Sequence, residues 1–204
     1  MANPTVMLVG RRCDDNLNLG LDYLLAALHD AGILACVRVL NHWQEMEPIC
    51  AEVQESQPRV VGLSLSDGGS AFLPLGLGEM LRRTGYRGHI TCGGQFATLA
   101  RQWLLERYPW LDSVIRFAGE TPLKSLVRCI GAGGDYRQVP GLTSRDGDGP
   151  PADLLDPTPL STLPHRGELP ELLGHAVAHV AATRGCRGRC AYCGPAALLS
   201  QEQH

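Results

Sequence analysis

Three cysteines near the end of the sequence have the spacing of a metal-binding loop. Cys186, Cys190 and Cys193 form the pattern Cys-x3-Cys-x2-Cys, with glycines at positions 185, 188 and 194. Because glycine adopts backbone conformations closed to other residues, the loop can turn three thiolates toward one point. Thiolates suit iron–sulfur clusters and zinc, and three of them can hold three irons of a [4Fe–4S] cluster while the fourth iron stays open to a small molecule. The main alternative is a Cys3His zinc site with His175 or His179 as the fourth ligand.

The residue before the third cysteine is aromatic. Tyr192 completes the run Cys190-Ala-Tyr-Cys193. With this aromatic residue and this spacing, the loop resembles the signature of the radical S-adenosylmethionine (SAM) superfamily. The resemblance implies a [4Fe–4S] cluster on Cys186, Cys190 and Cys193, with SAM bound at the open iron.

The composition predicts a globular cytoplasmic protein. Of the 204 residues, 44% are apolar and 19% are charged, and the formal net charge of −3 favours neither nucleic acid nor a membrane surface as partner. The sequence has no apolar run long enough for a transmembrane helix and does not begin like a signal peptide. Five of the eight cysteines are scattered and are expected in the core, which indicates one metal site rather than a disulfide framework (Cys13, Cys36, Cys50, Cys92 and Cys129).

Strands and helices are predicted to alternate between about residues 5 and 130. Continuous apolar runs predict strands, and helical spacing of apolar residues predicts the helices between them. The expected strands are 5–9, 33–39, 60–66, 89–93 and 114–117, and the expected helices lie around 17–28, 46–53, 70–83, 98–107 and 122–130. Short loops between such units predict a five-stranded parallel sheet in an α/β, doubly wound, Rossmann or flavodoxin-like domain. Ligands of such folds bind beyond the carboxyl ends of the strands.

Beyond this domain the composition changes. Residues 139–147 predict a hairpin with its turn at Asp146-Gly147, and prolines are frequent from Pro140 to Pro170. Residues 175–182 predict a strand that runs into the cysteine loop. We therefore expect an α/β domain at 1–134, a hairpin and linker at 135–174, and the start of a radical SAM barrel at 175–204.

Four short motifs fall at the expected binding edge, and their order carries a second resemblance. They are Asn18-Leu-Gly20 before Leu21-Asp-Tyr-Leu-Leu-Ala26, then Gly62-Leu-Ser-Leu-Ser66, Cys92-Gly-Gly94 and Ala118-Gly-Glu120. Over residues 5–130 the chain resembles the N-terminal cobalamin-binding domain found ahead of many radical SAM enzymes. The resemblance implies cobalamin as a cofactor. The residues expected to bind it are Asn16, Leu17, Asn18, Leu19, Gly20, Ser64, Ser66, Asp67, Gly93, Gly94, Gln95, Gly119 and Glu120.

Each of these residues also has an ordinary structural explanation. Gly93 and Gly94 would let a macrocycle and its nucleotide tail approach the backbone, or they form a plain strand-to-helix turn. Ser64 and Ser66 would donate hydrogen bonds to the tail, or they are half-buried strand serines. Glu120 would accept a hydrogen bond from a ribose hydroxyl, or it caps the last helix.

One position departs from the pattern Asp-x-His-x-x-Gly of many cobalamin proteins, in which the histidine coordinates cobalt. Asp15, Leu17 and Gly20 fit this frame, with leucine at the histidine position. Leucine cannot coordinate cobalt, so bound cobalamin is predicted to lack a histidine ligand from this frame. Flavin domains and phospho-receivers share the fold. A receiver is disfavoured because residues 60–66 contain no aspartate and the first one is Asp67.

The sequence ends eleven residues after Cys193, whereas a complete (β/α)8 barrel takes about 250 residues. We therefore expect catalysis to need a missing barrel half or a complementary chain. Three interpretations stay open. The chain is the N-terminal part of a cobalamin-dependent radical SAM enzyme, with methyltransferases among the candidates. It is a non-catalytic cobalamin-binding module. Or it is a zinc-stabilised Rossmann-like domain that binds another nucleotide.

Overall fold

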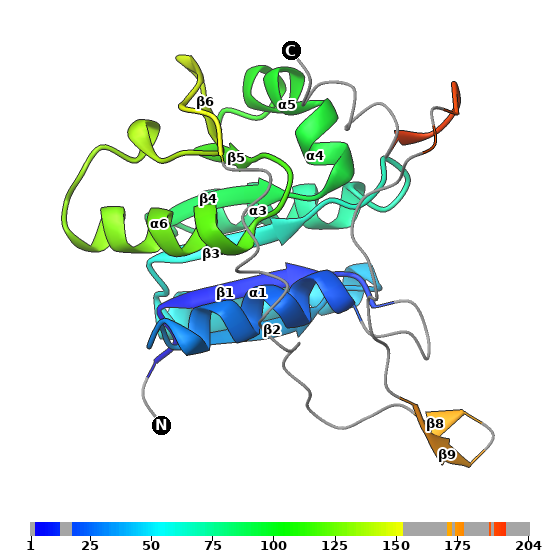
Figure 1. Ribbon diagram of the computed structural model, residues 1–204. Helices are drawn as coiled ribbons and strands as arrows, with labels where there is room; N and C mark the ends of the chain where they lie inside the picture. The colour runs from blue at the N-terminus through cyan, green and yellow to red at the C-terminus, as the bar shows by residue number, and fades with distance from the viewer. Residues whose placement is uncertain are drawn as a thin grey trace.

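A mostly parallel β-sheet forms the centre of the computed structural model, which describes residues 3–12, 18–152, 171–172, 174–177, 188 and 190–194. Its strands lie in the order β2-β1-β3-β4-β5-β6-β7 (Figure 1). The first five pair in parallel: β1 (Val6–Gly10), β2 (Ala35–Val39), β3 (Val60–Ser64), β4 (His89–Gly93) and β5 (Ser113–Ile115). The predicted α/β fold class is confirmed, and the order of strands reverses between β1 and β3.

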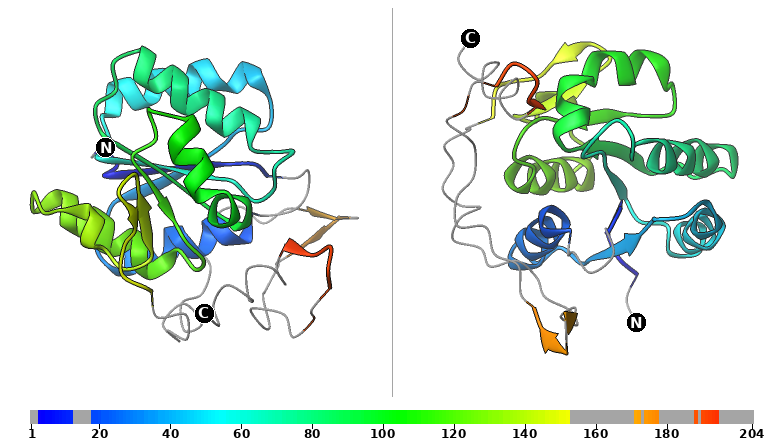
Figure 2. Two further views of the ribbon diagram at one scale, coloured as in Figure 1. Left: turned by 90° about the horizontal axis from the view of Figure 1, so that it is seen from above. Right: turned by 90° about the vertical axis from the view of Figure 1, so that its right-hand side faces the viewer.

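Helices cover both faces of the sheet (Figure 2). Helices α1 (Leu19–Asp30) and α6 (Glu120–Gly131) pack on one face. The other face is covered by α2 (Met46–Ser56), α3 (Phe72–Arg83), α4 (Gln95–Leu99) and α5 (Arg101–Arg107). A single helix was expected from Thr98 to Arg107, but the structure breaks it at Ala100, where α4 ends and α5 begins. Short 3-10 turns precede α2 (Trp43–Glu45) and β6 (Tyr136–Gln138).

The predicted hairpin extends the sheet instead of standing apart from it. Strand β6 (Leu142–Ser144) pairs antiparallel with β5, and β7 (Gly147–Asp148) pairs with β6. Because Ser144 pairs with Gly147, the chain reverses over Arg145 and Asp146, one residue earlier than the sequence indicated. The sequence pattern shows a hairpin but not which strand it will pair with.

A second, two-stranded sheet follows the linker. It consists of β8 (Glu171–Leu172) and β9 (His175–Ala176), which pair antiparallel. The strand expected over 175–182 is present at its first two residues, and residues 178–182 lie outside the described part of the chain. No helix within the described residues is both long enough and apolar enough to cross a membrane.

The two faces of the main sheet carry different side chains. Successive strand residues point to opposite faces. The face beneath α2 to α5 is filled by large apolar side chains such as Met7, Leu63 and Ile90. The face beneath α1 and α6 begins with Val6 and Val60 but carries small residues toward the carboxyl ends of the strands (Gly10, Gly62, Ser64, Thr91 and Gly93). Side chains therefore fill less of the space between the sheet and helices α1 and α6 near the carboxyl edge.

Candidate functional site

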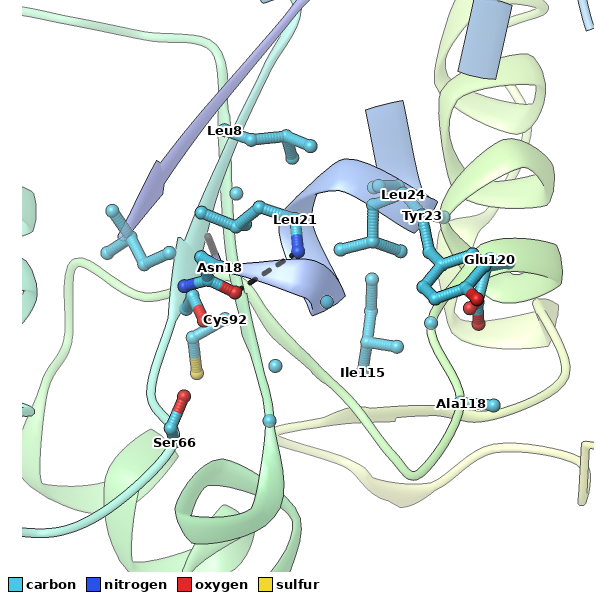
Figure 3. A pocket seen from close by; sticks show the side chains of 18 of the residues that line it. Leu8, Asn18, Leu21, Tyr23, Leu24, Ser66, Cys92, Ile115, Ala118 and Glu120 are labelled. Atoms are coloured by element: carbon cyan, nitrogen blue, oxygen red, sulfur yellow. Dashed lines mark hydrogen bonds between the residues drawn. The ribbon is translucent and has the colours of Figure 1, made fainter. Parts of the chain in front are cut away.

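A cavity of about 470 Å³ occupies the space that these small residues leave. It lies at the carboxyl edge of the sheet, between the strand ends and helices α1 and α6. Figure 3 shows the apolar side chains of Leu8, Leu21, Leu24 and Ile115 around it. Further lining residues come from the loops after β3, β4 and β5 (Ser66, Gly94, Gln95, Phe117, Ala118 and Gly119). The site is thus built from the edge at which doubly wound folds bind their ligands.

The cavity reaches below the edge along the strands. Leu8, Gly62 and Thr91 line it and are paired with one another across β1, β3 and β4. This row lies two residues before the row of Ser64 and Gly93, which corresponds to about 7 Å of depth. A Cβ on Gly62 would lie only 2.8 Å from Leu8 Cδ2. Glycine at position 62 therefore leaves room for the Leu8 side chain, which lines the deep part of the cavity.

Asn18 positions the first turn of α1 at the cavity. Its Oδ1 accepts a hydrogen bond from the Leu21 backbone N–H at 3.2 Å, and its Nδ2 donates to the Arg11 carbonyl at 2.8 Å. The residue is therefore the N-cap of the helix. Asn18, Leu19 and Gly20 all line the cavity, as the sequence predicted. A helix N-terminus at this place favours a negatively charged group nearby.

The adjacent glycines Gly93 and Gly94 have different structural roles. Gly94 has a φ of +107°, and a Cβ there would lie 2.6 Å from the Leu65 carbonyl oxygen. Glycine at this position is explained by the turn itself, without a ligand. A Cβ on Gly93 would lie 3.6 Å from the Ile115 carbonyl oxygen, which is ordinary contact, and Gly93 lines the cavity. Of the two glycines, Gly93 is therefore the one whose missing side chain leaves space in the cavity.

The serines and the aspartate after β3 separate into two groups. Ser64 and Ser66 line the cavity. Asp67 is exposed and is not among the lining residues; its carboxylate accepts hydrogen bonds from the Ser70 hydroxyl at 2.6 Å and from the Ser70 backbone N–H at 2.8 Å. These bonds, led by the hydroxyl, hold the pKa of Asp67 below its usual value. In this structure Asp67 serves the turn before α3.

The remaining predicted residues are three that line the cavity and two that the structure does not describe. Gln95, Gly119 and Glu120 line the cavity, and the Glu120 side chain is buried at the first position of α6. Asn16 and Leu17 lie outside the described residues. The structure thus brings together predicted residues from four separate loops.

Several lining residues were not among those predicted to bind cobalamin, although some of them stand in the motifs assigned to this edge. They are Leu8, Leu21, Tyr23, Leu24, Gly62, Leu63, Thr91, Cys92, Ile115, Phe117, Ala118 and Leu123. A signal was present for some of them. Counting back by two from Ser64 and Gly93 gives Gly62 and Thr91, because alternate strand residues share a face.

One hydroxyl connects two of the loops around the cavity. Thr98 Oγ1 donates to the Gly94 carbonyl at 3.0 Å and accepts from the Phe117 backbone N–H at 3.0 Å. Phe117 has a φ of +57°, which is uncommon for a bulky residue. Thr98, which is fully buried, therefore holds the loop after β5 against the turn after β4.

Part of the cysteine loop lies near the carboxyl-terminal end of α4. Cys190 is exposed, Cys193 is half-buried, and the Cys193 N–H donates to the Cys190 carbonyl at 3.1 Å. A Cβ on Gly194 would lie 3.9 Å from Leu99 Cδ1, which places Gly194 beside the carboxyl-terminal end of α4.

The metal ligands expected for this loop lie partly outside the described chain. Cys186 and His179 fall outside the described residues, and His175 is exposed. Within the described residues, no group of three His, Cys, Asp or Glu side chains is placed to hold a metal ion.

The fold and the cavity define the class: an α/β domain with the strand order 2-1-3-4-5 and a deep ligand site at its carboxyl edge. The model of the family described as "B12 binding domain" matches residues 6–127, more than half of the chain. The chain belongs to the B12-binding domain family.

Three known proteins are similar to this chain over most of the chain's own length. An uncharacterised methyltransferase of Pyrococcus horikoshii is 21% identical over 183 residues, which are 86% of this chain and 40% of that protein. Among solved structures, the cobalamin-dependent SAM radical enzyme OxsB, with aqua-cobalamin and SAM bound, matches with a TM-score of 0.62 at 24% identity, over 74% of this chain and 22% of that one. The radical SAM methyltransferase TsrM of Kitasatospora setae matches with a TM-score of 0.61 at 22% identity, over 72% and 30%. The chain therefore spans less than half the length of each.

Proposed function

We propose that the cavity takes the nucleotide tail of cobalamin and that the macrocycle lies across the carboxyl edge above it. The observation that carries this proposal is the deep slot over Gly62, Thr91 and Gly93 in a B12-binding domain. Its apolar walls suit a flat aromatic base, and its small floor residues admit the base edge-first. Larger side chains at these three positions would close the slot, so their small size fits the site to the cofactor.

The residues of the chain divide the work of binding. The start of α1 at Leu19 and Gly20 suits the phosphate of the tail, because backbone N–H groups of a helix N-terminus favour anions. Ser64 and Ser66 are placed to donate hydrogen bonds to polar groups near the mouth. Leu21, Leu24 and Leu123 exclude water from the base. Cobalamin, when bound, supplies a cobalt centre that can carry a methyl group.

We further propose that the chain is the N-terminal part of a cobalamin-dependent radical SAM enzyme and that the reaction is a methyl transfer. Cys186, Cys190 and Cys193 would hold a [4Fe–4S] cluster, and SAM would bind its open iron. The names of the relatives support this, and so does the position of Gly194, the residue after Cys193, beside α4. The partner is a catalytic barrel, either in the same polypeptide or in a separate chain.

Cobalamin binding is tested first. The purified chain is titrated with aquocobalamin, and bound cofactor is followed by visible absorbance after gel filtration. We expect one cobalamin per chain to co-elute with the protein. Free cobalamin separating from folded protein at all concentrations would refute the proposal.

The cysteine loop is tested independently. After anaerobic reconstitution with iron and sulfide, we expect four irons and four sulfides per chain at most, falling sharply in Cys190→Ala and Cys193→Ala. Cys36→Ala is the matched control, because Cys36 lies on β2 away from the loop. Bound zinc with no sulfide would instead favour the Cys3His alternative.

A further inference from the structure

A chain of three polar side chains runs across β4 and β5 and ends at the cavity. The Ser113 hydroxyl donates to Thr91 Oγ1 at 2.9 Å, and His89 Nε2 lies 2.8 Å from Ser113 Oγ. The Thr91 hydroxyl donates to the Ser113 carbonyl at 3.2 Å. Thr91 and Ser113 are paired across the two strands and are almost completely buried.

The protons of this chain have one consistent arrangement. Since Ser113 gives its proton to Thr91, it must accept from His89, which therefore carries its proton on Nε2. Burial lowers the pKa of His89 to about 4, so the ring is neutral at pH 7. The ring also packs edge-on against Tyr136, with 4.7 Å between centroids. The Thr91 oxygen accepts from Ser113, so what it can offer a further partner is its proton.

Thr91 differs from its neighbours in the cavity because it carries a hydroxyl. It lines the deep part of the cavity together with Leu8, Gly62 and Ile115, none of which has a polar side-chain atom. Its present acceptor, the Ser113 carbonyl, is 3.2 Å away, at the long end for a hydroxyl donor. Because a hydroxyl proton moves by rotation about the Cβ–Oγ bond, this long hydrogen bond can be exchanged for one to a better-placed acceptor.

We propose that the Thr91 hydroxyl donates a hydrogen bond to a ring nitrogen on the base of the inserted nucleotide tail, and that Ser113 and His89 position this hydroxyl. The inference rests on the proposed cobalamin binding. It makes Thr91 a determinant of which cobamides the site prefers: those whose lower base is a bicyclic nitrogen heterocycle over those whose base has no ring nitrogen. Where the deep part of the pocket offers a hydrogen-bond donor, a base with a matching acceptor binds more tightly than a base without one.

The test compares three ligands on three proteins. The ligands are cobalamin, a cobamide whose base is a phenol linked through oxygen, and cobinamide, which has no tail. The proteins are the unaltered chain, Thr91→Val, which removes the hydroxyl at similar volume, and Thr91→Ser, which keeps it. We expect Thr91→Val to bind cobalamin about 5-fold to 10-fold more weakly. Thr91→Ser should bind cobalamin nearly as well as the unaltered chain, and the dissociation constants for the phenolic cobamide and cobinamide should not change.

The outcomes separate this inference from the proposal beneath it. Equal cobalamin affinity in folded Thr91→Val would overturn the inference while leaving cobalamin binding intact. A loss of the same size for all three ligands would also overturn it, because the hydroxyl would then only support the fold. Failure of the unaltered chain to bind any of the three would refute the proposed function itself. If Thr91→Val does not fold, Ser113→Ala takes its place, and unchanged preference for cobalamin over the phenolic cobamide in that variant overturns the positioning role.

Discussion

Gly93 offers the sharpest test of where the cofactor lies. Gly93 ends β4 and lines the cavity, and its backbone does not require glycine, because its φ is not in the left-handed region. A Cβ there would have its nearest contacts at 3.6 and 3.7 Å, to the carbonyl oxygen and Cβ of Ile115. Gly93→Val therefore adds a β-branched side chain that suits a strand and points into the cavity.

The expected loss of affinity follows from overpacking. Adding methyl groups to a filled site costs about 1–3 kcal/mol, which corresponds to about 5-fold to 150-fold in the dissociation constant. Gly93→Ala should lie at or below the low end of this range. Because the free protein has space at this position, the free energy of unfolding should change little.

The neighbouring glycine is the control. A Cβ on Gly94 would lie 2.6 Å from the Leu65 carbonyl oxygen, at a φ of +107°, so Gly94→Ala should destabilise the fold itself. Urea unfolding without ligand and cobalamin titration by absorbance are measured on all variants. A folded Gly93→Val protein that binds cobalamin as tightly as the unaltered chain would show that the ligand does not use this slot.

Three further predictions concern single groups. Thr98→Val removes the partner of the Phe117 N–H and should lower the free energy of unfolding by about 1–3 kcal/mol, whereas Thr98→Ser should not; equal urea midpoints for the two would contradict this. Burial lowers the pKa of His89 from about 6.5 in the unfolded chain to about 4 in the folded one, while nearby Asp112 raises it and Arg82 lowers it. The contribution of neutral His89 to the free energy of unfolding is therefore present above pH 6.5 and is lost as the pH falls toward 4. Between pH 7.5 and pH 5 the titration of His89 should lower the free energy of unfolding, measured in urea, by about 2 kcal/mol. His89→Gln should lack this part of the pH dependence. Electron paramagnetic resonance of bound cob(II)alamin should show no nitrogen splitting from a protein imidazole, because none of the described cavity residues is a histidine and residues 13–17 contain none; a splitting that disappears in a histidine variant would overturn this.

The strands could be predicted from the sequence because parallel strands buried on both faces are continuous apolar runs. Val60 to Ser64 and His89 to Gly93 were found within two residues of their observed ends. The binding edge followed from the order of elements, since alternating strands and helices bring all strand carboxyl ends together. Of the predicted binding residues that the structure describes, all except Asp67 accordingly line one cavity.

Other features depend on pairing across the sheet, which a local pattern does not contain. The depth of the cavity arises because Leu8, Gly62 and Thr91 share one register row. The true reason for glycine at position 94 is a contact with Leu65, twenty-nine residues earlier in the chain. The hydrogen bonds of Thr91 could not be recognised for the same reason, since its partner Ser113 lies on a different strand.

The register of two strands therefore decides whether the site exists. On β3 and β4 the small residues Gly62, Thr91 and Gly93 face α1 and α6. The side chains of Leu63 and Cys92 between them pack in the core on the opposite face, although both residues also border the cavity. Since side chains alternate, a slip by one residue would turn the large side chains into the slot and the glycines into the packed core. The filled face beneath α2 to α5 prevents this, because it would have to exchange buried leucine and isoleucine for glycine. Packing on the side without a ligand thus fixes the alignment that leaves the other side open.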